Sequence, residues 1–274
     1  MPDLAELLED VERVILGFDG PVCSLYAGES AGDVAERLRK VAAQELAASA
    51  GRSDGALGLP KVLRLTDDPL DFLPLLGEAV RDAEVLAASS AAATAGTAGA
   101  LAAARRSERV VSIVSNNARE AVEAYLTDRG LLKHFEAIEA RTGSSAADVA
   151  RLKPHPHLLL AALEGYAAGH HCTLDEARRV TVFVGGSVTD VQAATAAGVR
   201  CIALANAPGK ARRFAEPGSG AASATATTAT TAATTSTTTT TTTTVIAVIT
   251  SMHELADGLN ARWDDQWCAR QYCC

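Results

Sequence analysis

Five short runs of apolar, mostly β-branched residues recur along the chain and are separated by stretches with helical patterns. They lie at residues 13–17 (RVILG), 109–115 (RVVSIVS), 180–186 (VTVFVGG), 200–205 (RCIALA) and 245–250 (VIAVIT). Continuous apolar runs of this length are typical of strands in a parallel sheet that helices cover on both faces. The pattern therefore predicts an α/β chain with a Rossmann-like parallel sheet.

Two of the segments between these runs carry signals for the ends of helices. Asn117 is predicted to cap a helix, because Glu120 follows three residues later and Gly130 stands where the helix would stop. Gly198 is predicted to end an Ala-rich helix after the third run. Both helices would lie against the sheet.

A long segment without a strand pattern separates the first run from the second. Ser30 is a candidate cap for a helix that places Val34, Leu38 and Val41 on one face. A second helical region follows and is interrupted at Pro74. A connection of this length is uncommon inside a compact domain, so we expect a separate, small helical cap domain inserted after the first strand.

The predicted domain boundaries follow from this segment. Residues 25–106 are assigned to the cap, and residues 1–24 and 107–274 to the α/β core. Inside the core, residues 219–244 are a Thr/Ala low-complexity stretch without charge and without large apolar side chains. We expect this stretch to be a poorly ordered surface insertion.

The composition narrows the classes of partner. The formal net charge of −8 argues against nucleic acid and anionic membranes, because both select a basic face. No apolar run approaches the roughly 20 residues that span a bilayer. The acidic, amphipathic N-terminus lacks the features of a secretory signal, so we expect a cytoplasmic location. The sequence leaves the oligomeric state open.

In an open parallel sheet, ligands bind beyond the carboxyl ends of the strands. Four segments with polar side chains fall there. They contain Asp19 after the first run, Ser115 and Asn116 at the end of the second, Lys153 before the third and Asp190 after it. A hydroxyl group at the N-terminus of a helix is suited to holding a phosphate group.

In their order and placement these segments resemble the haloacid dehalogenase superfamily of phosphohydrolases. The resemblance is greatest to its phosphoglycolate-phosphatase-like branch, which has a helical cap after the first motif. That motif reads Asp-x-Asp-Gly-Thr (or Pro) in the family, and residues 17–21 here read Gly-Phe-Asp-Gly-Pro. Ser115 matches the second motif and Lys153 the third. The fourth motif, Gly-Asp-Ser-x-x-Asp, is matched by residues 185–190, which read GGSVTD.

The resemblance implies a phosphate monoester hydrolase that acts on a small phosphorylated metabolite with Mg²⁺ as cofactor. In the family the first aspartate attacks phosphorus, and the second, here Asp19, protonates the leaving group and then activates water. Asp19 and Lys153 are thus the implied catalytic residues, and Ser115, Asn116 and Lys153 the implied phosphate ligands. In the family, the metal ligands are the carboxylate of the first aspartate, the carbonyl oxygen of the second and a carboxylate of the fourth motif. The resemblance thus implies the Asp19 carbonyl oxygen as a metal ligand here, with Asp190 near the edge of the metal.

Two glycines interrupt the implied catalytic machinery. Gly17 occupies the position of the attacking aspartate, and Gly186 that of the first aspartate in the fourth motif. Glycine offers no side chain to attack phosphorus or to bind a cation, and Mg²⁺ usually takes one or two carboxylates. Loss of members of a catalytic unit can cost on the order of 10⁴–10⁶ in rate. We therefore expect an impaired metal site and a hydrolase that is inactive or strongly impaired.

Each of these residues also has a purely structural interpretation. Asp19 in FDGP is a common turn carboxylate, Lys153 a solvated loop lysine, and Asp190 a partner for a helix N-terminus. His155 and His157, two residues apart in a Pro-interrupted loop, are favoured as helix-entry residues over a metal pair.

Three functional hypotheses remain open. The first is a phosphatase by descent that has lost ordinary catalysis. The second is a non-catalytic protein that binds a phosphorylated metabolite, or another partner, on the same fold. The third is a working hydrolase that uses water or another carboxylate, with turnover that Asp19→Ala or Lys153→Ala would abolish. We favour the first for origin and the second for the present role, and we leave the status as an enzyme open.

Overall fold

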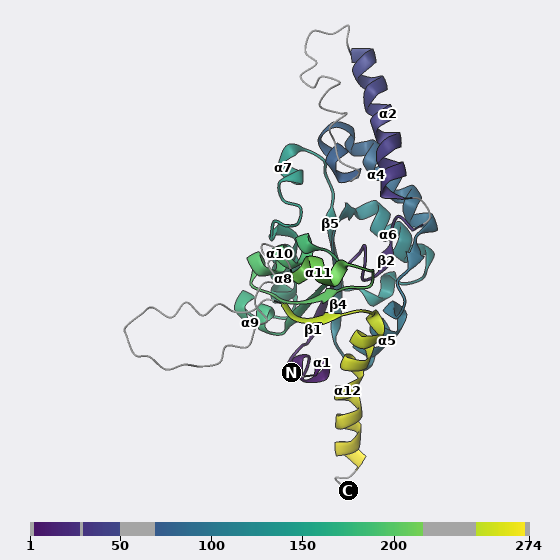
Figure 1. Cartoon of the computed structure of the whole chain (residues 1–274). Coiled ribbons are helices and arrows are strands. Elements are labelled where there is room, and N and C mark those ends of the chain that lie inside the picture. The colour runs from purple at the N-terminus through teal and green to yellow at the C-terminus, as the bar shows by residue number, and fades with distance from the viewer. Residues whose placement is uncertain (1–2, 28–29, 50–68, 216–244, 272–274) are drawn as a thin grey trace, which may run out of the picture.

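The computed structural model describes residues 3–27, 30–49, 69–215 and 245–271 (Figure 1). The strands are β1 (Arg13–Gly17), β2 (Cys23–Ser24), β3 (Ala92–Ala93), β4 (Val110–Ala118), β5 (Ala137–Arg141), β6 (Thr181–Gly185), β7 (Arg200–Leu204) and β8 (Val245–Ile249). The helices before β4 are α1 (Leu4–Leu7), α2 (Ala31–Ser49), η1 (Pro69–Phe72), α4 (Leu73–Ser90) and α5 (Thr97–Arg106). Those after it are α6 (Arg119–Asp128), η2 (Leu132–His134), α7 (Ala146–Val149), α8 (His157–Gly169), α9 (Leu174–Arg179), α10 (Val188–Ala197), α11 (Lys210–Ala215) and α12 (Met252–Gln271).

The main sheet has six parallel strands in the order β5-β4-β1-β6-β7-β8. Strand β1 lies between β4 and β6, with Gly17 opposite Val114 and Leu16 opposite Val184. The strand order reverses direction at β1, because later strands are added on both of its sides. The carboxyl ends of β1, β4 and β6 therefore meet at one edge, at the switch point where ligands bind in such sheets.

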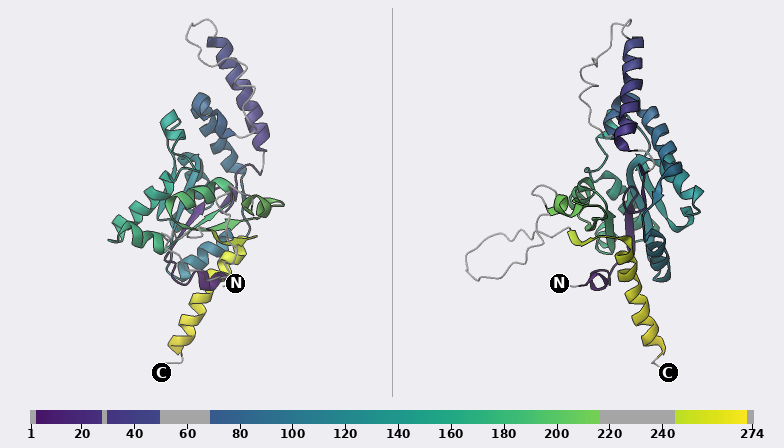
Figure 2. Two further views of the ribbon diagram at one scale, coloured as in Figure 1. Left: turned by 60° about the vertical axis from the view of Figure 1, so that its left-hand side comes forward. Right: turned by 45° about the vertical axis from the view of Figure 1, so that its right-hand side comes forward.

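Helices cover both faces of the sheet (Figure 2). Val14 and Leu16 of β1 pack into a core with α5, α6 and α12, whereas Ile15 packs into a second core with α8, α9 and α10. Every residue of β1 and β6 is buried, which explains their continuous apolar sequences. The predicted fold class, an α/β chain with a parallel sheet, is confirmed.

All five apolar runs form strands of the main sheet, within a few residues of their predicted ends. The sixth strand, β5, was not predicted. Its sequence, AIEAR, contains two charged residues, and it lies at the edge of the sheet beyond β4. An edge strand with polar side chains has no continuous apolar run by which to recognise it.

The long inserted segment is helical where the structure describes it, and α2 projects away from the sheet beside α4 (Figures 1 and 2). Ser30 caps α2 as predicted, since its hydroxyl accepts from the Asp33 N–H at 3.1 Å. Val34 and Leu38 are buried, but Val41 is exposed, which corrects the predicted face. Pro74 lies in the first turn of α4, where proline is tolerated, and does not interrupt a helix there.

Antiparallel pairing of β2 with β3 joins the two ends of this insertion. Helix α5 follows β3 and packs against α12, which leaves the sheet on the side away from α2 (Figure 1). The assignment of residues 25–106 to a cap domain stays a prediction. The Thr-rich stretch at residues 219–244 lies outside the described residues.

The predicted cap of α6 is wrong. The N-cap residue is Ala118, and no side chain forms a capping hydrogen bond there. The Asn117 amide instead donates to Glu84 and accepts from Ser115. Gly130 adopts φ +64° just after the end of α6, in agreement with its predicted role as a stop, and Gly198 ends α10 in the same left-handed conformation. Among the described residues, no helix has the length and hydropathy needed to cross a membrane.

Gly96, before α5, gives a test of the packing between α5 and α12. The φ of Gly96 is +90°, and a Cβ there would lie 2.4 Å from the backbone nitrogen of His253. We expect Gly96→Ala to lower the free energy of unfolding by at least about 2 kcal/mol, from backbone strain and overpacking. In the control, Gly165→Ala, a Cβ meets nothing within 4 Å in helix α8, so we expect a gain of about 0.5–1 kcal/mol. Urea denaturation measures both changes, and equal effects at the two sites would contradict this account.

Candidate functional site at the carboxyl edge of the sheet

The first and fourth motifs lie in direct backbone contact at this edge. A Cβ placed on Gly186 would lie 3.3 Å from the Asp19 carbonyl oxygen and 3.3 Å from the Gly20 Cα. A Cβ on Gly17 would meet Pro21 and the Val184 carbonyl oxygen at 3.5 Å. The two glycines therefore occupy neighbouring positions around one point beyond β1 and β6.

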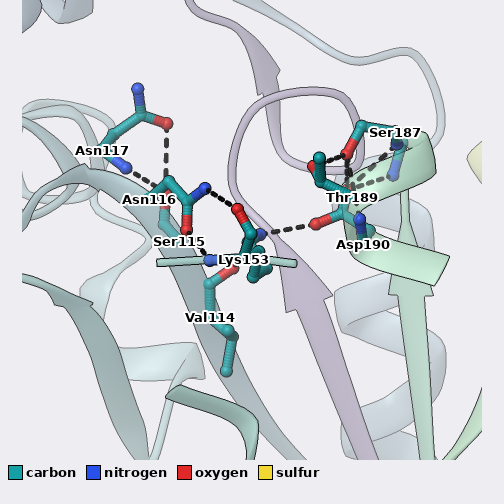
Figure 3. A network of polar contacts seen from close by, with 9 residues as sticks. Val114, Ser115, Asn116, Asn117, Lys153, Ser187, Thr189 and Asp190 are labelled. Carbon is teal, nitrogen blue, oxygen red and sulfur yellow. Dashed lines mark hydrogen bonds and ion pairs between the residues drawn. The ribbon is translucent and has the colours of Figure 1, made fainter. Parts of the chain in front are cut away.

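Lys153 reaches the same point from the loop before α8 (Figure 3). Its Nζ lies 2.6 Å from Asp190 Oδ1 and donates to the Val114 carbonyl oxygen at 3.2 Å. The side chains of Lys153 and Asp190 are only 7% and 4% exposed, so this ion pair is nearly buried. The Lys153 side chain is thus not the solvated loop lysine of its structural interpretation.

The second carboxylate oxygen of Asp190 is occupied by the turn at the start of α10. Oδ2 accepts hydrogen bonds from the Gly186 and Ser187 N–H groups at 2.9 and 3.0 Å, and from the Ser187 hydroxyl at 2.8 Å. Ser187 and Asp190 form a capping box for α10. Asp190 thus serves the helix N-terminus, as in its structural interpretation, and also pairs with Lys153, a contact that the sequence did not predict.

Ser115 and Asn116 lie at the end of β4, beside Lys153 (Figure 3). The Ser115 hydroxyl is part of a tight turn, because it donates to Asn117 Oδ1 and accepts from the Asn117 N–H, both at 3.0 Å. The Asn116 amide makes two hydrogen bonds to the main chain of Lys153: Oδ1 accepts from its N–H at 2.8 Å and Nδ2 donates to its carbonyl at 3.0 Å. The Asn116 side chain therefore joins the second motif to the main chain of the third.

Asp19 lies in the turn after β1, where its Oδ1 accepts from the Leu25 N–H at 3.0 Å. Asp19 is exposed by its accessible surface. Desolvation by the surrounding protein nevertheless raises the pKa of its carboxyl above the usual range, and the Leu25 hydrogen bond and the Lys210 charge offset only part of this. Asp19 thus fits the turn carboxylate of its structural interpretation, with a raised pKa.

The sequence did not single out Glu84 and Arg141, which are both buried beside the second motif. Glu84, on α4, forms an ion pair with Arg141 at the end of β5 and accepts hydrogen bonds from Asn117 Nδ2 and the Ala118 N–H. Burial raises the pKa of Glu84, whereas the Arg141 charge and these hydrogen bonds lower it. Glu84 lies in a segment assigned to the cap and Arg141 in a strand that was missed, so nothing in the sequence connected them.

Lys210 is a second cation that sequence reasoning missed. It is the first residue of α11, donates to Asn206 Oδ1 at 3.0 Å, and its charge acts on the Asp19 carboxyl. The available signal was its place in the segment that follows the carboxyl end of a predicted strand.

The two loop histidines lie at the entry to α8, as favoured from the sequence. The ring centroids of His155 and His157 are 6.4 Å apart, and His155 Nδ1 accepts the His157 N–H at the start of α8. Among the residues that the structure describes, no three His, Cys, Asp or Glu side chains group closely enough to hold a metal ion.

Comparisons with known proteins give one family model that matches part of the chain and solved structures with a similar fold. Residues 75–204 match the family model of haloacid dehalogenase-like hydrolases. A search of curated proteins finds no match.

Solved structures with the same fold include CbbY from Rhodobacter sphaeroides in complex with phosphate, at 21% identity and a TM-score of 0.52, over 91% of this chain and 99% of that one. A haloacid dehalogenase-like protein of unknown function from Agrobacterium tumefaciens matches at 21% identity and a TM-score of 0.53, over 92% and 98% of the two chains. The hydrolase YfnB from Bacillus subtilis, bound to magnesium, matches at 15% identity and a TM-score of 0.52, over 91% and 99%. The chain thus shares the fold of these haloacid dehalogenase-like structures, and its residues 75–204 match the model of the haloacid dehalogenase-like hydrolase family.

Proposed function

We propose that this chain binds the phosphate group of a small phosphorylated metabolite and lacks the metal-dependent hydrolysis of its family. The observation that carries the proposal is the direct ion pair between Lys153 Nζ and Asp190 Oδ1, at 2.6 Å. It puts an ammonium group at the carboxyl edge of the sheet, beside two positions that have no side chain, Gly17 and Gly186.

The residues around these glycines do not fit Mg²⁺. The ion needs oxygen ligands in near-octahedral geometry and usually takes one or two carboxylates. The Asp19 carbonyl oxygen is available, but both oxygens of Asp190 already hold partners: Lys153 on one side and the α10 turn on the other. Gly17 and Gly186 add no carboxylate. We therefore derive no step through a metal ion.

The charges at this edge favour a phosphate ester without a metal. Lys153 and Lys210 supply two positive charges, from the loop before α8 and from the start of α11. Lys153 is proposed to hold the phosphate through its ammonium group, with Ser115 and Asn116 beside it. The phosphate bound to the similar protein CbbY supports this ligand class.

Hydrolysis at an ordinary rate is the second candidate function. The family match over residues 75–204 favours it, because this region contains Ser115 and Lys153. Against it stands the absence of a nucleophile at Gly17. Asp19 lies two residues further along the chain, inside the turn, and its Oδ1 is bonded to the Leu25 N–H.

The binding proposal is tested with 2-phosphoglycolate as the probe, by isothermal titration calorimetry. We expect saturable binding whose dissociation constant changes less than twofold when EDTA replaces Mg²⁺, because no metal ion takes part in the proposed site. Lys153→Met should weaken binding at least tenfold, since it removes the nearly buried cation. The control is Lys133→Met, an exposed lysine in η2. Binding that requires Mg²⁺, or that Lys153→Met leaves unchanged, would contradict the proposal.

Loss of catalysis is tested by restoring the two carboxylates. A Cβ at Gly17 makes only ordinary contacts, and one at Gly186 requires its neighbours to move by a few tenths of an ångström. We expect the double variant Gly17→Asp/Gly186→Asp to hydrolyse p-nitrophenyl phosphate with Mg²⁺ on the order of 10⁴-fold faster than the unaltered chain. Each single variant should stay close to background. Fast, Mg²⁺-dependent turnover by the unaltered chain would refute the loss of catalysis.

The raised pKa of Asp19 predicts a pH dependence of stability. The folded state keeps this proton to higher pH than the unfolded state, whose pKa is near the ordinary value of 3.8. The penalty for desolvating the carboxylate is therefore absent below about pH 3.8 and grows as pH rises toward the raised folded value. We expect Asp19→Asn to be more stable than the unaltered chain at pH 7, with a difference that shrinks toward pH 4. Urea denaturation between pH 4 and 8 measures it, and an equal or lower stability at pH 7 would count against a desolvated, destabilising carboxylate.

A further inference from the structure

We propose that Glu84 is a positioning residue for the phosphate site: paired with Arg141, it fixes the turn at residues 115–118 and, through Asn116, the main chain of Lys153. This inference rests on the proposed function, because the site it positions is the proposed phosphate site. The Glu84 side chain makes no contact with that site itself and acts through the residues between them.

Glu84 holds the turn from the side of helix α4. Its side chain is fully buried, and both of its oxygens are used. Oε1 accepts from Asn117 Nδ2 at 3.1 Å, and Oε2 accepts from the Ala118 N–H at 2.9 Å and from Arg141 Nη2. Three donors from two strands therefore converge on one carboxylate, which fixes the end of β4 relative to β5.

Arg141 extends this contact to the third motif. While Nη2 bonds to Glu84, its Nε donates to the Asn116 carbonyl oxygen at 3.0 Å. The Asn116 side chain then makes its paired hydrogen bonds with the N–H and carbonyl groups of Lys153. Each link is a hydrogen bond between buried or part-buried groups, so a continuous path joins Glu84 to the main chain of Lys153, whose side chain carries the ammonium group.

The charge of Glu84 is what makes this path specific. A carboxylate accepts from all three donors at once, whereas a neutral amide presents one oxygen acceptor and a donor in place of the other. Removal of one partner from a buried ion pair also leaves the other charge without compensation. Without the Glu84 charge, Arg141 Nη2 would bind another acceptor, and this would disturb the hydrogen bond from Arg141 Nε to the Asn116 carbonyl oxygen.

The path also connects the phosphate site to the inserted segment. Glu84 lies on α4, which contacts α2 and η1 in that segment. The helix has a non-helical residue, Leu76, at φ −132° and ψ 41°, between its start and Glu84. A displacement of the last two turns of α4 would therefore be felt at the 115–118 turn. This gives the inserted segment a physical route to the phosphate ligands.

The test is Glu84→Gln, which keeps the shape of the side chain and removes its charge. The matched control is Asp82→Asn, two residues away on the same helix, where the carboxylate is 69% exposed. Two quantities are measured at a temperature where circular dichroism shows all variants folded. One is the affinity for 2-phosphoglycolate, and the other is the hydrogen exchange rate of the amides at residues 116–118 and 153.

We expect Glu84→Gln to weaken binding at least tenfold and to speed exchange at these amides at least tenfold, with Asp82→Asn within twofold of the unaltered chain. Arg141→Lys is the second variant and is used for both readouts where Glu84→Gln does not fold. It keeps a cation for Glu84 but removes the forked guanidinium group that also donates to Asn116. We expect weaker binding and faster exchange in this variant too.

The inference is overturned if the folded variants bind as tightly as the unaltered chain and exchange at the same rates, whatever their melting temperatures. Failure of the proposed function looks different. In that case the unaltered chain does not bind 2-phosphoglycolate at all, and the exchange rates alone decide whether Glu84 positions the turn and Lys153.

Discussion

The ion pair between Lys153 and Asp190 is the contact on which this account depends. It joins the loop before α8 to the turn that begins α10, across the carboxyl end of β1. Each partner also has hydrogen bonds to other groups. The Lys153 N–H donates to Asn116, and Asp190 accepts from the Gly186 and Ser187 N–H groups. Because these hydrogen bonds are local, the site keeps a defined shape although Gly17 and Gly186 contribute only backbone. A positive group is thus held in place beside two positions that have no side chain, Gly17 and Gly186.

The fold could be predicted from the sequence to the extent that burial leaves a pattern. Strands that lie inside the sheet, such as β1 and β6, are buried on both faces and therefore have continuous apolar sequences. Edge strand β5 was missed because two of its five residues, Glu139 and Arg141, are charged, so its sequence has no continuous apolar run. The cap of α6 was assigned wrongly, since Asn117 uses its amide for Glu84, a partner 33 residues earlier in the chain that no local pattern reveals.

The candidate site was predicted in its parts but not in its connections. Residues just beyond strand ends, such as Asp19 and Lys153, can be listed from the sequence because parallel strands bring their carboxyl ends to one edge. The Glu84–Arg141 pair depends on the packing of α4 beside β4 and β5, which the sequence does not encode locally. Lys210 followed the same strand-end rule and was overlooked only because no motif marked it.

Electron paramagnetic resonance with Mn²⁺ tests most directly whether the proposed phosphate site is centred on the Lys153 ammonium group rather than on a metal ion. Mn²⁺ prefers the same oxygen ligands as Mg²⁺ and its signal broadens when it is bound. In the presence of saturating 2-phosphoglycolate, we expect the Mn²⁺ spectrum to be the same with and without the unaltered chain. It should show only the free ion and its complex with the ester. A stoichiometric, broadened signal that Asp190→Asn abolishes would contradict it.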